Sequence, residues 1–225
     1  MGTGKTLTAT ALAYTEHVKY GRRILANYHL NFPHTFFDYE YFLRHLGDEE
    51  LNNCITILDE AALALECRSN TKLNRLFTYY IVQTRKRYVD LYLCTQHIDM
   101  IDKRARRAPD VRGTCRYRGE DPCGQCSGTK EVNNGFCGEC GGAGKSGDST
   151  NGNVCPVCLG TGKGTVCPRC LGYGVTGWAT TRLFDLRTGK RTKIRVFGPA
   201  FWGLYDTTER VPFTKKQVRI PVEDL

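Results

Sequence analysis

The chain lacks a long hydrophobic run. None of its 225 residues lies in a segment that approaches the ~20 consecutive apolar residues of a membrane helix. Residues 1–15 also lack a basic stretch followed by an apolar core, so no signal peptide is expected. We therefore predict a cytoplasmic protein without a transmembrane segment. Its length leaves room for one α/β domain and a small satellite.

The front of a phosphate-binding loop is also missing. The chain begins Met-Gly-Thr-Gly-Lys-Thr, which matches the end of the Walker A pattern G-x-x-x-x-G-K-[ST]. The first glycine of that pattern would lie upstream of Met1, as would the apolar strand that feeds such a loop. We expect either a true start farther upstream or a damaged site. The main chain at Gly2 and Gly4 would cradle phosphates of ATP, Lys5 would reach the β- and γ-phosphates, and Thr6 would bind Mg²⁺.

Cysteine, in contrast, is abundant, although no export signal favours disulfides. Eight of the twelve cysteines form four Cys-x-x-Cys pairs, a spacing that indicates zinc. Eight thiolates predict two Zn²⁺ ions, each held by four sulfurs. Cys54 and Cys94 abut or lie within strand-like runs and are predicted to be small core residues. The predicted zinc ligands are Cys123, Cys126, Cys137, Cys140, Cys155, Cys158, Cys167 and Cys170.

Composition divides the chain into three sections. Residues 1–112 alternate helix-like and strand-like segments, which predicts an α/β fold with a parallel sheet and helices on both of its faces. Residues 113–177 are rich in glycine and cysteine and have too few apolar residues for their own core. Residues 178–225 are strand-like, with a hairpin turn at 187–190. The middle section is therefore predicted to be a small zinc-binding insertion in a nucleotide-binding domain that residues 178–225 complete.

Local patterns place the elements of the first section. Helices are expected at 7–20 with Gly21 as the stop, at 38–46 with Asp38 as N-cap, near 71–84 and at 99–108. Strands are expected at 22–30, 54–58 and 90–95. Near the other end, Trp202, Leu204 and Tyr205 are expected to pack back on the sheet.

Two carboxylates follow the buried-looking strand at 54–58. Asp59 and Glu60 have the arrangement of a Walker B element, in which the aspartate supports Mg²⁺ and the glutamate polarises the attacking water. Acids at strand ends are common, so the inference depends on the Gly-Lys-Thr upstream. Gln96 ends the next strand, where it would sense the γ-phosphate or position water. A lone glutamine can also be an ordinary surface residue.

Basic residues give the chain a formal net charge of +9. A polyanionic partner and a solvated surface both account for this charge. Arg85 and Arg87 lie at the end of a predicted helix. One of them would be an arginine finger that reaches the γ-phosphate of a neighbouring subunit, or both would simply complement the helix dipole. The sequence leaves these alternatives open.

The order of these motifs resembles one family. Gly-Thr-Gly-Lys-Thr, Ile-Leu-Asp-Glu-Ala and the segments at 83–97 and 101–111 look like the Zot-like (zonula occludens toxin-like) branch of the FtsK/HerA-type motor ATPases of filamentous phages and archaeal viruses. The segment at 196–209 resembles the closing strand of that family. By resemblance, Lys5 and Thr6 bind phosphate and magnesium, Asp59 and Glu60 form Walker B, and Gln96 is the sensor.

The resemblance implies a RecA-like P-loop domain that works in a homo-oligomeric ring, commonly a hexamer. Such a ring uses ATP to move or package DNA, or to serve phage morphogenesis. The DNA would be double-stranded and gripped by a basic lumen without sequence readout. Capsid or membrane-associated viral proteins would be further partners, in the cytoplasm of the host.

The cysteine section resembles the zinc-binding region of the DnaJ co-chaperones. Each pair opens a Cys-x-x-Cys-x-Gly-x-Gly motif, with Lys130 in place of the last glycine of the first one. The resemblance implies that pairs one and four share one zinc and that pairs two and three share the other. The chain has no His-Pro-Asp tripeptide, so it is not itself a co-chaperone. Its role is a rigid arm, a docking site for a capsid or membrane partner, or a DNA contact through Lys130, Lys145, Lys163 and Arg169.

Two rival functions follow from the same residues. The first is a zinc-dependent binding or scaffold protein with a truncated, inactive nucleotide site. The second is another P-loop enzyme, such as a nucleotide kinase. The adjacent Asp59 and Glu60 argue against a kinase, because phosphoryl transfer to a substrate needs no water-activating glutamate.

Overall fold

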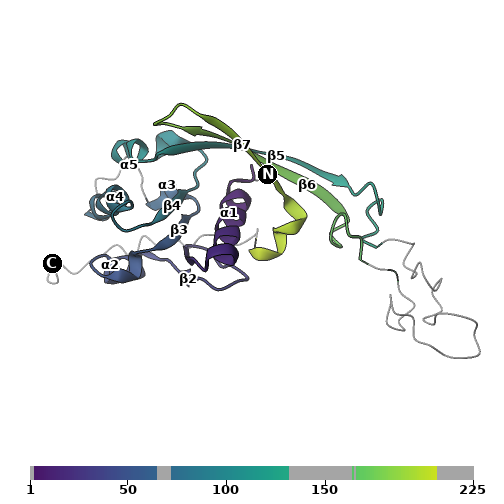
Figure 1. Cartoon of the computed structure of the whole chain (residues 1–225), viewed down its shortest axis with the longest axis horizontal. Helices are drawn as coiled ribbons and strands as arrows, with labels where there is room; N and C mark the ends of the chain where they lie inside the picture. Colours follow the sequence, from purple (N-terminus) through teal and green to yellow (C-terminus); the bar gives the residue numbers. More distant parts are fainter. Residues whose placement is uncertain (1–2, 65–71, 132–163, 165, 207–225) are drawn as a thin grey trace, which may run out of the picture.

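The computed structural model describes residues 3–64, 72–131, 164 and 166–206. This part of the chain has two sheets (Figure 1). One is parallel, with strand order β2-β1-β3-β4, and the other is antiparallel, with strand order β5-β6-β7. The strands are β1 (Arg23–Ala26), β2 (Thr35–Phe36), β3 (Cys54–Leu58), β4 (Asp90–Leu93), β5 (Val111–Pro122), β6 (Val175–Asp185) and β7 (Arg191–Phe197).

Helices cover both faces of the parallel sheet, as predicted. Because neighbouring residues of a strand point to opposite faces, β1 gives Leu25 to one core and Ile24 and Ala26 to the other. The first core holds side chains of α2 and α4, and the second holds α1. The helices are α1 (Lys5–Tyr20), α2 (Tyr39–His45), α3 (Ala61–Ala64), α4 (Lys72–Gln83) and α5 (Lys103–Arg107), with short 3-10 turns at Glu49–Leu51, Ile98–Met100, Gly198–Ala200 and Trp202–Leu204.

Helix α1 lies between the two sheets, which its small side chains make possible. Leu7, Ala9, Ala11 and Ala13 are buried, and so are the threonines at 8 and 10. A helix buried on more than one side cannot show a single apolar stripe. The hydroxyl of Thr10 meets the Tyr28 hydroxyl at 2.7 Å on the parallel-sheet side. On the other side, the hydroxyls of Thr8 and Thr181 in β6 are 2.9 Å apart.

Glycines bound α1 at both ends. Gly21 ends the helix in the left-handed conformation (φ 65°), as the sequence predicts, and its N–H donates to the carbonyl of His17. Gly4 precedes the helix with φ 82° and lies against β6. A Cβ atom at position 4 would be 2.9 Å from the Cβ of Ala179, so both the backbone angle and the close approach require glycine there.

Several predicted elements are confirmed with small shifts of their ends. Strand β3 has the predicted bounds and is buried throughout. Helix α2 begins after Asp38, whose side chain accepts a hydrogen bond from the N–H of Tyr41. The β6–β7 hairpin forms as predicted. Tyr205 is buried in the core beside α1, with Trp202 and Leu204 packed against it. Cys54 and Cys94 are buried, as expected.

Other predictions were wrong in extent. The strand expected at 22–30 ends at Ala26, because the chain then leaves β3: Leu30 pairs with Tyr205, and the N–H of Asn31 donates to the carbonyl of Leu204. The short basic helix is confined to Lys103–Arg107. Strand β5 was not predicted, and it forms a second, antiparallel sheet with the β6–β7 hairpin.

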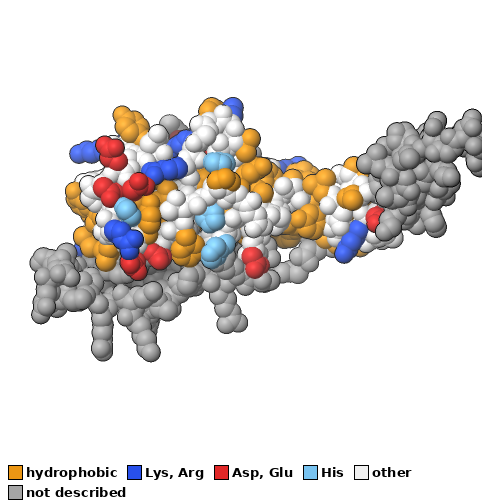
Figure 2. Space-filling model, turned by 90° about the horizontal axis from the view of Figure 1, so that it is seen from below, with side chains coloured by type: hydrophobic (Ala, Val, Ile, Leu, Met, Phe, Trp, Pro, Cys, Tyr) orange, Lys and Arg blue, Asp and Glu red, His pale blue; other side chains and the backbone are white. Residues whose placement is uncertain are grey.

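The antiparallel sheet extends away from the α/β part and ends at a cysteine-rich tip (Figure 1). No helix among the described residues is long and apolar enough to cross a bilayer. On the face shown in Figure 2, basic and acidic side chains are intermixed over the α/β part.

Candidate functional site

The predicted nucleotide residues meet at the carboxyl ends of the parallel strands. The start of α1 lies beside the end of β3, where the hydroxyl of Thr6 donates to Oδ2 of Asp59 at 2.8 Å. Lys5 precedes Thr6, and its Nζ donates to the hydroxyl of Thr3 at 3.0 Å in an exposed contact that a ligand can replace at low cost. A hydroxyl and a carboxylate in contact form an oxygen pair of the kind that Mg²⁺ prefers. These residues fit the magnesium site that the sequence predicts.

Asn27 holds the end of β3 in place, a role that the sequence analysis missed. Its side-chain amide donates to the carbonyl of Asp59 at 2.9 Å and accepts from the N–H of Asp59 at 2.8 Å. The backbone of Asp59 is therefore held by one side chain from the neighbouring strand β1. Its position in the sequence could have revealed this role, because Asn27 directly follows a strand that ends at the same sheet edge as β3.

Glu60 has a strained backbone beside Gln96. Its φ of 47° lies in the left-handed region, which is uncommon for a residue other than glycine and recurs at functional sites. Its N–H donates to the carboxylate of Asp59 at 3.0 Å, and its own carboxylate accepts from the Gln96 amide at 3.2 Å. The structure thus brings Glu60 and Gln96 together, because β3 and β4 are adjacent and parallel.

The carboxyl group of Asp59 is partly buried, which changes its acidity. Burial raises the pKa of Asp59, while the hydrogen bond from Thr6 and the N–H of Glu60 oppose the rise. A raised pKa means that the folded state binds the proton more tightly than the unfolded chain does. The stability from this group is present below the ordinary aspartate pKa of about 3.9 and is lost as the pH rises through the raised value.

Asp59→Asn should therefore raise the melting temperature at pH 7 in the absence of Mg²⁺. The amide keeps an oxygen for Thr6 but removes the buried negative charge, and each kcal/mol corresponds to roughly 2–4 °C in a protein of this size. The gain should shrink as the pH falls toward about 4, where the native carboxyl becomes protonated. Thermal unfolding of the variant and the wild type at several pH values measures this gain in melting temperature. Asp99→Asn, at a carboxylate that is 86% exposed, should give no such gain. Equal gains at pH 7 and pH 4 would contradict the assignment.

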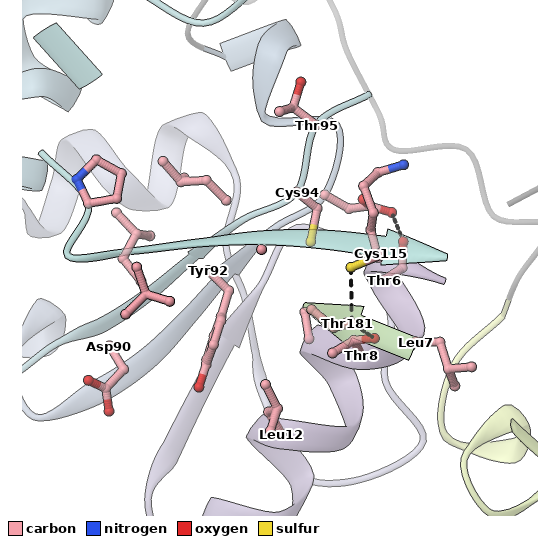
Figure 3. A pocket seen from close by; sticks show the side chains of 18 of the residues that line it. Thr6, Leu7, Thr8, Leu12, Asp90, Tyr92, Cys94, Thr95, Cys115 and Thr181 are labelled. Carbon is pink, nitrogen blue, oxygen red and sulfur yellow. Dashed lines mark hydrogen bonds between the residues drawn. The ribbon is translucent and has the colours of Figure 1, made fainter. Parts of the chain in front are cut away.

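A hollow extends from the predicted nucleotide residues along the edge of β4 (Figure 3). It is bounded by the start of α1, by β4 and by β5. Among the described strands, β4 pairs on one edge only, with β3. An unpaired strand edge beside a hollow leaves room for another extended segment. The residues that line it include Lys5, Asp59, Glu60, Arg85 and Gln96.

The two candidate arginines occupy different places. Arg85 has an exposed side chain that lines the hollow and pairs with Asp110 at 2.8 Å. Arg87 does not line it. Its guanidinium donates to the carbonyl of Leu46 at 2.7 Å and to Oδ1 of Asn52 at 3.2 Å, which ties the end of α4 to the segment before β3. Arg85 is therefore held by one exposed ion pair, whereas Arg87 is tied to the segment before β3.

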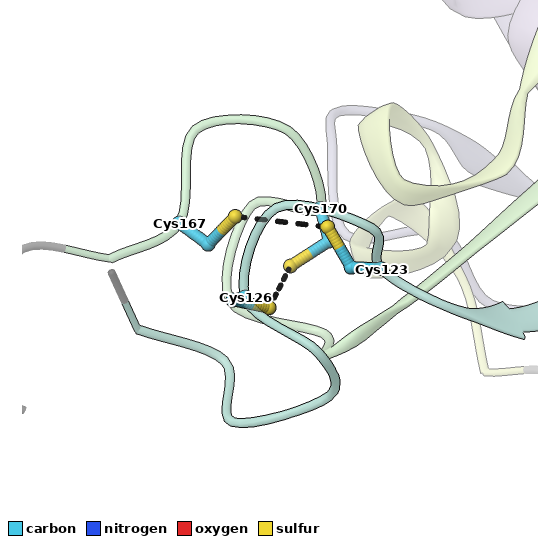
Figure 4. A group of neighbouring side chains, drawn as sticks. All are labelled: Cys123, Cys126, Cys167 and Cys170. Carbon is cyan, nitrogen blue, oxygen red and sulfur yellow. Dashed lines mark hydrogen bonds between the residues drawn. The ribbon is translucent and has the colours of Figure 1, made fainter. Parts of the chain in front are cut away.

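Four buried cysteines form a cluster at the tip of the antiparallel sheet (Figure 4). The Sγ atoms of Cys123 and Cys167 are 3.8 Å apart, those of Cys126 and Cys170 are 3.7 Å apart, and all four lie within 4.8 Å of one another. A tetrahedral zinc with Zn–S bonds of about 2.3 Å requires sulfurs about 3.8 Å apart. The cluster therefore has the composition and the dimensions of a zinc site.

Backbone groups around the cluster favour thiolates. Desolvation raises the pKa of the Cys123 thiol, but N–H groups of Cys126 and Gln125 and the neighbouring thiols lower it to about 7 overall. Desolvation and the hydrogen bonds to Cys170 and Cys123 raise the pKa of its neighbour Cys167 to about 11, although backbone N–H groups oppose that rise. The N–H of Gly174 points at the sulfur of Cys170, at 3.3 Å. Gly174 has φ 78°, and a Cβ there would be 2.7 Å from the carbonyl of Gly128, so the last glycine of the fourth motif allows the loops to close.

The cluster joins the first and fourth Cys-x-x-Cys pairs, which is the pairing that the sequence resemblance implies. One site that could hold a zinc ion is therefore present among the described residues. The other predicted ligands, Cys137, Cys140, Cys155 and Cys158, lie outside the described residues, as does Gly2 of the loop.

Comparison with known proteins finds a solved structure with a similar fold. No protein-family model and no curated protein matches the chain. The crystal structure of the N-terminal domain of zonular occludens toxin from Neisseria meningitidis is similar to it, with a TM-score of 0.50 and 13% sequence identity. The similarity covers 91% of this chain and 94% of that one. The chain therefore has a fold like that of this toxin domain.

Proposed function

We propose that this chain, with a fold like that of the zonular occludens toxin N-terminal domain, is the ATP-hydrolysing part of a motor that moves or packages DNA or serves phage morphogenesis. The observation that carries the proposal is the contact between Thr6 and Asp59 at 2.8 Å, with Glu60 and Gln96 joined beside it. This contact links the loop that would hold a triphosphate to the carboxylate that would hold Mg²⁺, and the carboxylate that would activate water is the next residue.

Each residue has a defined task in this proposal. Lys5 binds the β- and γ-phosphates, and the main chain at Gly4 lies beside them at the start of α1, where N–H groups favour anions. Thr6 and Asp59 hold Mg²⁺, which neutralises phosphate charge when it is bound. Glu60 accepts a proton from the attacking water, and Gln96 fixes the position of Glu60.

The proposed assembly is a homo-oligomeric ring, commonly a hexamer, in the cytoplasm of the host. Arg85 is the better candidate for a finger that acts on the γ-phosphate of a neighbour, because it is exposed and lines the same hollow as Lys5. Two Zn²⁺ ions would stiffen the cysteine-rich arm, one of them at the cluster described above. Capsid or membrane-associated proteins are the proposed docking partners of that arm.

The test is phosphate release from ATP, measured with and without DNA, in a protein that carries the complete phosphate-binding loop. Hydrolysis that DNA accelerates supports the motor. Transfer of phosphate to a nucleoside would favour a nucleotide kinase instead. Failure of the complete loop to bind ATP would favour a zinc-dependent scaffold with an inactive site.

A further inference from the structure

The two faces of the antiparallel sheet carry different kinds of residue. Strand alternation separates its residues into two sets. Ala179, Thr181 and Val196 are buried toward α1, so the residues between them face away from the molecule. In Figure 1, this face lies on the side of the sheet opposite α1.

The strand register arranges these outward positions in four rows across β5, β6 and β7. They hold seven basic residues, three aromatic residues and two threonines, and no acidic residue. The rows are Arg112–Phe184–Arg191, Thr114–Arg182–Lys193, Arg116–Thr180–Arg195 and Arg118–Trp178–Phe197.

Charge on this face is not neutralised within the described part of the protein. None of its seven basic side chains is in an ion pair with a described acidic residue. Arg182 and Lys193 lie directly opposite each other, an arrangement of like charges that destabilises a sheet. The face shown in Figure 2, by contrast, intermixes both signs. A bound polyanion would relieve this repulsion, so the charges favour an anionic partner.

The aromatic side chains narrow the choice among polyanions. Trp178 is 47% exposed and Phe184 is 39% exposed, although both are large and apolar. Trp178 lies against Phe197 with ring centroids 4.9 Å apart, and the guanidinium of Arg191 lies over Phe184 at 5.9 Å. In single-stranded DNA the faces of the bases are exposed and can stack on aromatic side chains. Aromatic rings set among arginines therefore suit a single strand, because the arginines can contact its phosphates. A duplex hides those ring faces and would leave the aromatic residues unused.

We propose that this face binds single-stranded DNA, with bases on Trp178 and Phe184 and phosphates along the arginine rows. The outward residues from Arg112 to Arg118 span about 20 Å at the rise of a β-strand, enough for a few nucleotides. The inference refines the proposed motor, for which the sequence alone suggested double-stranded DNA. Binding to this face needs no ATP, so its test does not depend on the nucleotide site.

The experiment uses fluorescence anisotropy of a labelled oligo-dT with the full chain and no ATP. Arg116→Glu/Arg195→Glu reverses two charges of one row. It should weaken binding by tenfold or more and lower the slope of log affinity against log salt by about 0.7 for each lost phosphate contact. Lys19→Glu/Arg44→Glu makes the same charge change on α1 and α2 and should leave binding within about twofold of wild type.

Variants at Trp178 distinguish the contribution of base stacking from that of charge. Trp178→Ala should weaken single-strand binding by about tenfold without changing the affinity for a duplex of the same length, while Trp178→Phe should restore most of the loss. Circular dichroism shows whether each variant is folded. If Trp178→Ala does not fold, the comparison of Trp178→Phe with the wild type still tests the role of the aromatic ring.

Several results would overturn the proposal. Equal binding by the two double variants would show that the face is not the site. A preference for duplex, or competition by vesicles rich in phosphatidylserine at equal charge, would assign the face to another anion. A change of sedimentation coefficient in Arg116→Glu/Arg195→Glu, with DNA binding unchanged, would show that a second copy of the chain covers it.

Discussion

Replacing Glu60 with glutamine should slow ATP hydrolysis by about a hundredfold to ten-thousandfold and leave ATP binding unchanged. Glutamine retains the size of the side chain and can still bond to Gln96, which now donates to the Glu60 carboxylate at 3.2 Å. It cannot take a proton from water. The effect should therefore fall on the chemical step alone, which single-turnover phosphate release measures separately from nucleotide affinity.

Glu50→Gln is the matched control for this variant. Glu50 lies in the 3-10 turn Glu49–Leu51, and its exposed carboxylate pairs with Arg23 at the amino end of β1, whereas Glu60 follows the carboxyl end of β3. Its replacement should leave hydrolysis at the wild-type rate. If Glu60→Gln and Glu50→Gln both hydrolyse ATP like the wild type, Glu60 is not the residue that activates water.

Zinc content should depend on which cysteines are removed, and not only on how many. Cys126→Ser/Cys170→Ser removes two ligands of the same cluster and should cost one of two equivalents of zinc. Cys126→Ser/Cys140→Ser removes one ligand from each predicted site and should cost both. Elemental analysis of the purified variants measures this directly. Structural zinc contributes about 10 kcal/mol or more, so each lost ion should also unfold its part of the arm.

The two double variants are controls for each other, because each replaces two cysteines with serine. Limited proteolysis between residues 113 and 177 reports the local unfolding independently of the metal measurement. Equal zinc contents in the two variants would contradict the division of eight ligands into the predicted pairs. Wild-type protein without zinc would contradict the site itself.

Local chemistry made part of the fold predictable. The α1 stop at Gly21, the cap at Asp38 and the whole of β3 follow from side chains that act on their own neighbours. The contact between Glu60 and Gln96 follows from strand order, because residues that follow adjacent parallel strands lie at the same edge of the sheet. The sharing of one site by the first and fourth cysteine pairs came from motif resemblance and agrees with the observed cluster.

What the sequence did not reveal depends on contacts between distant segments. Strand β5 combines arginines with small residues, and only its pairing with β6 makes it a strand. The burial of α1 on two sides depends on a second sheet, and no local sequence pattern predicts how the strands of that sheet pair. Arg87 looked equivalent to Arg85 in sequence, but the carbonyl of Leu46 engages it, and that carbonyl is 41 residues away in the chain.

The outer face of the antiparallel sheet shows the same limit. The net charge of +9 left a polyanion partner and a solvated surface open, and it did not show that Arg112, Arg116 and Arg118 share one face of a sheet. The register adds residues of β6 and β7 to them and puts every one on the same side. Periodicity of two along each strand was available in the sequence, but the partner strands were not.

Equilibrium binding of ATP to Lys5→Ala tests the central claim most directly. If the start of α1 holds the triphosphate, removing the Lys5 ammonium should weaken binding by about tenfold to hundredfold, as the loss of charge-assisted hydrogen bonds implies. Lys19→Ala, at the far end of the same helix, should bind ATP like the wild type. The same affinity in all three proteins would contradict a nucleotide site at Lys5, Thr6 and Asp59.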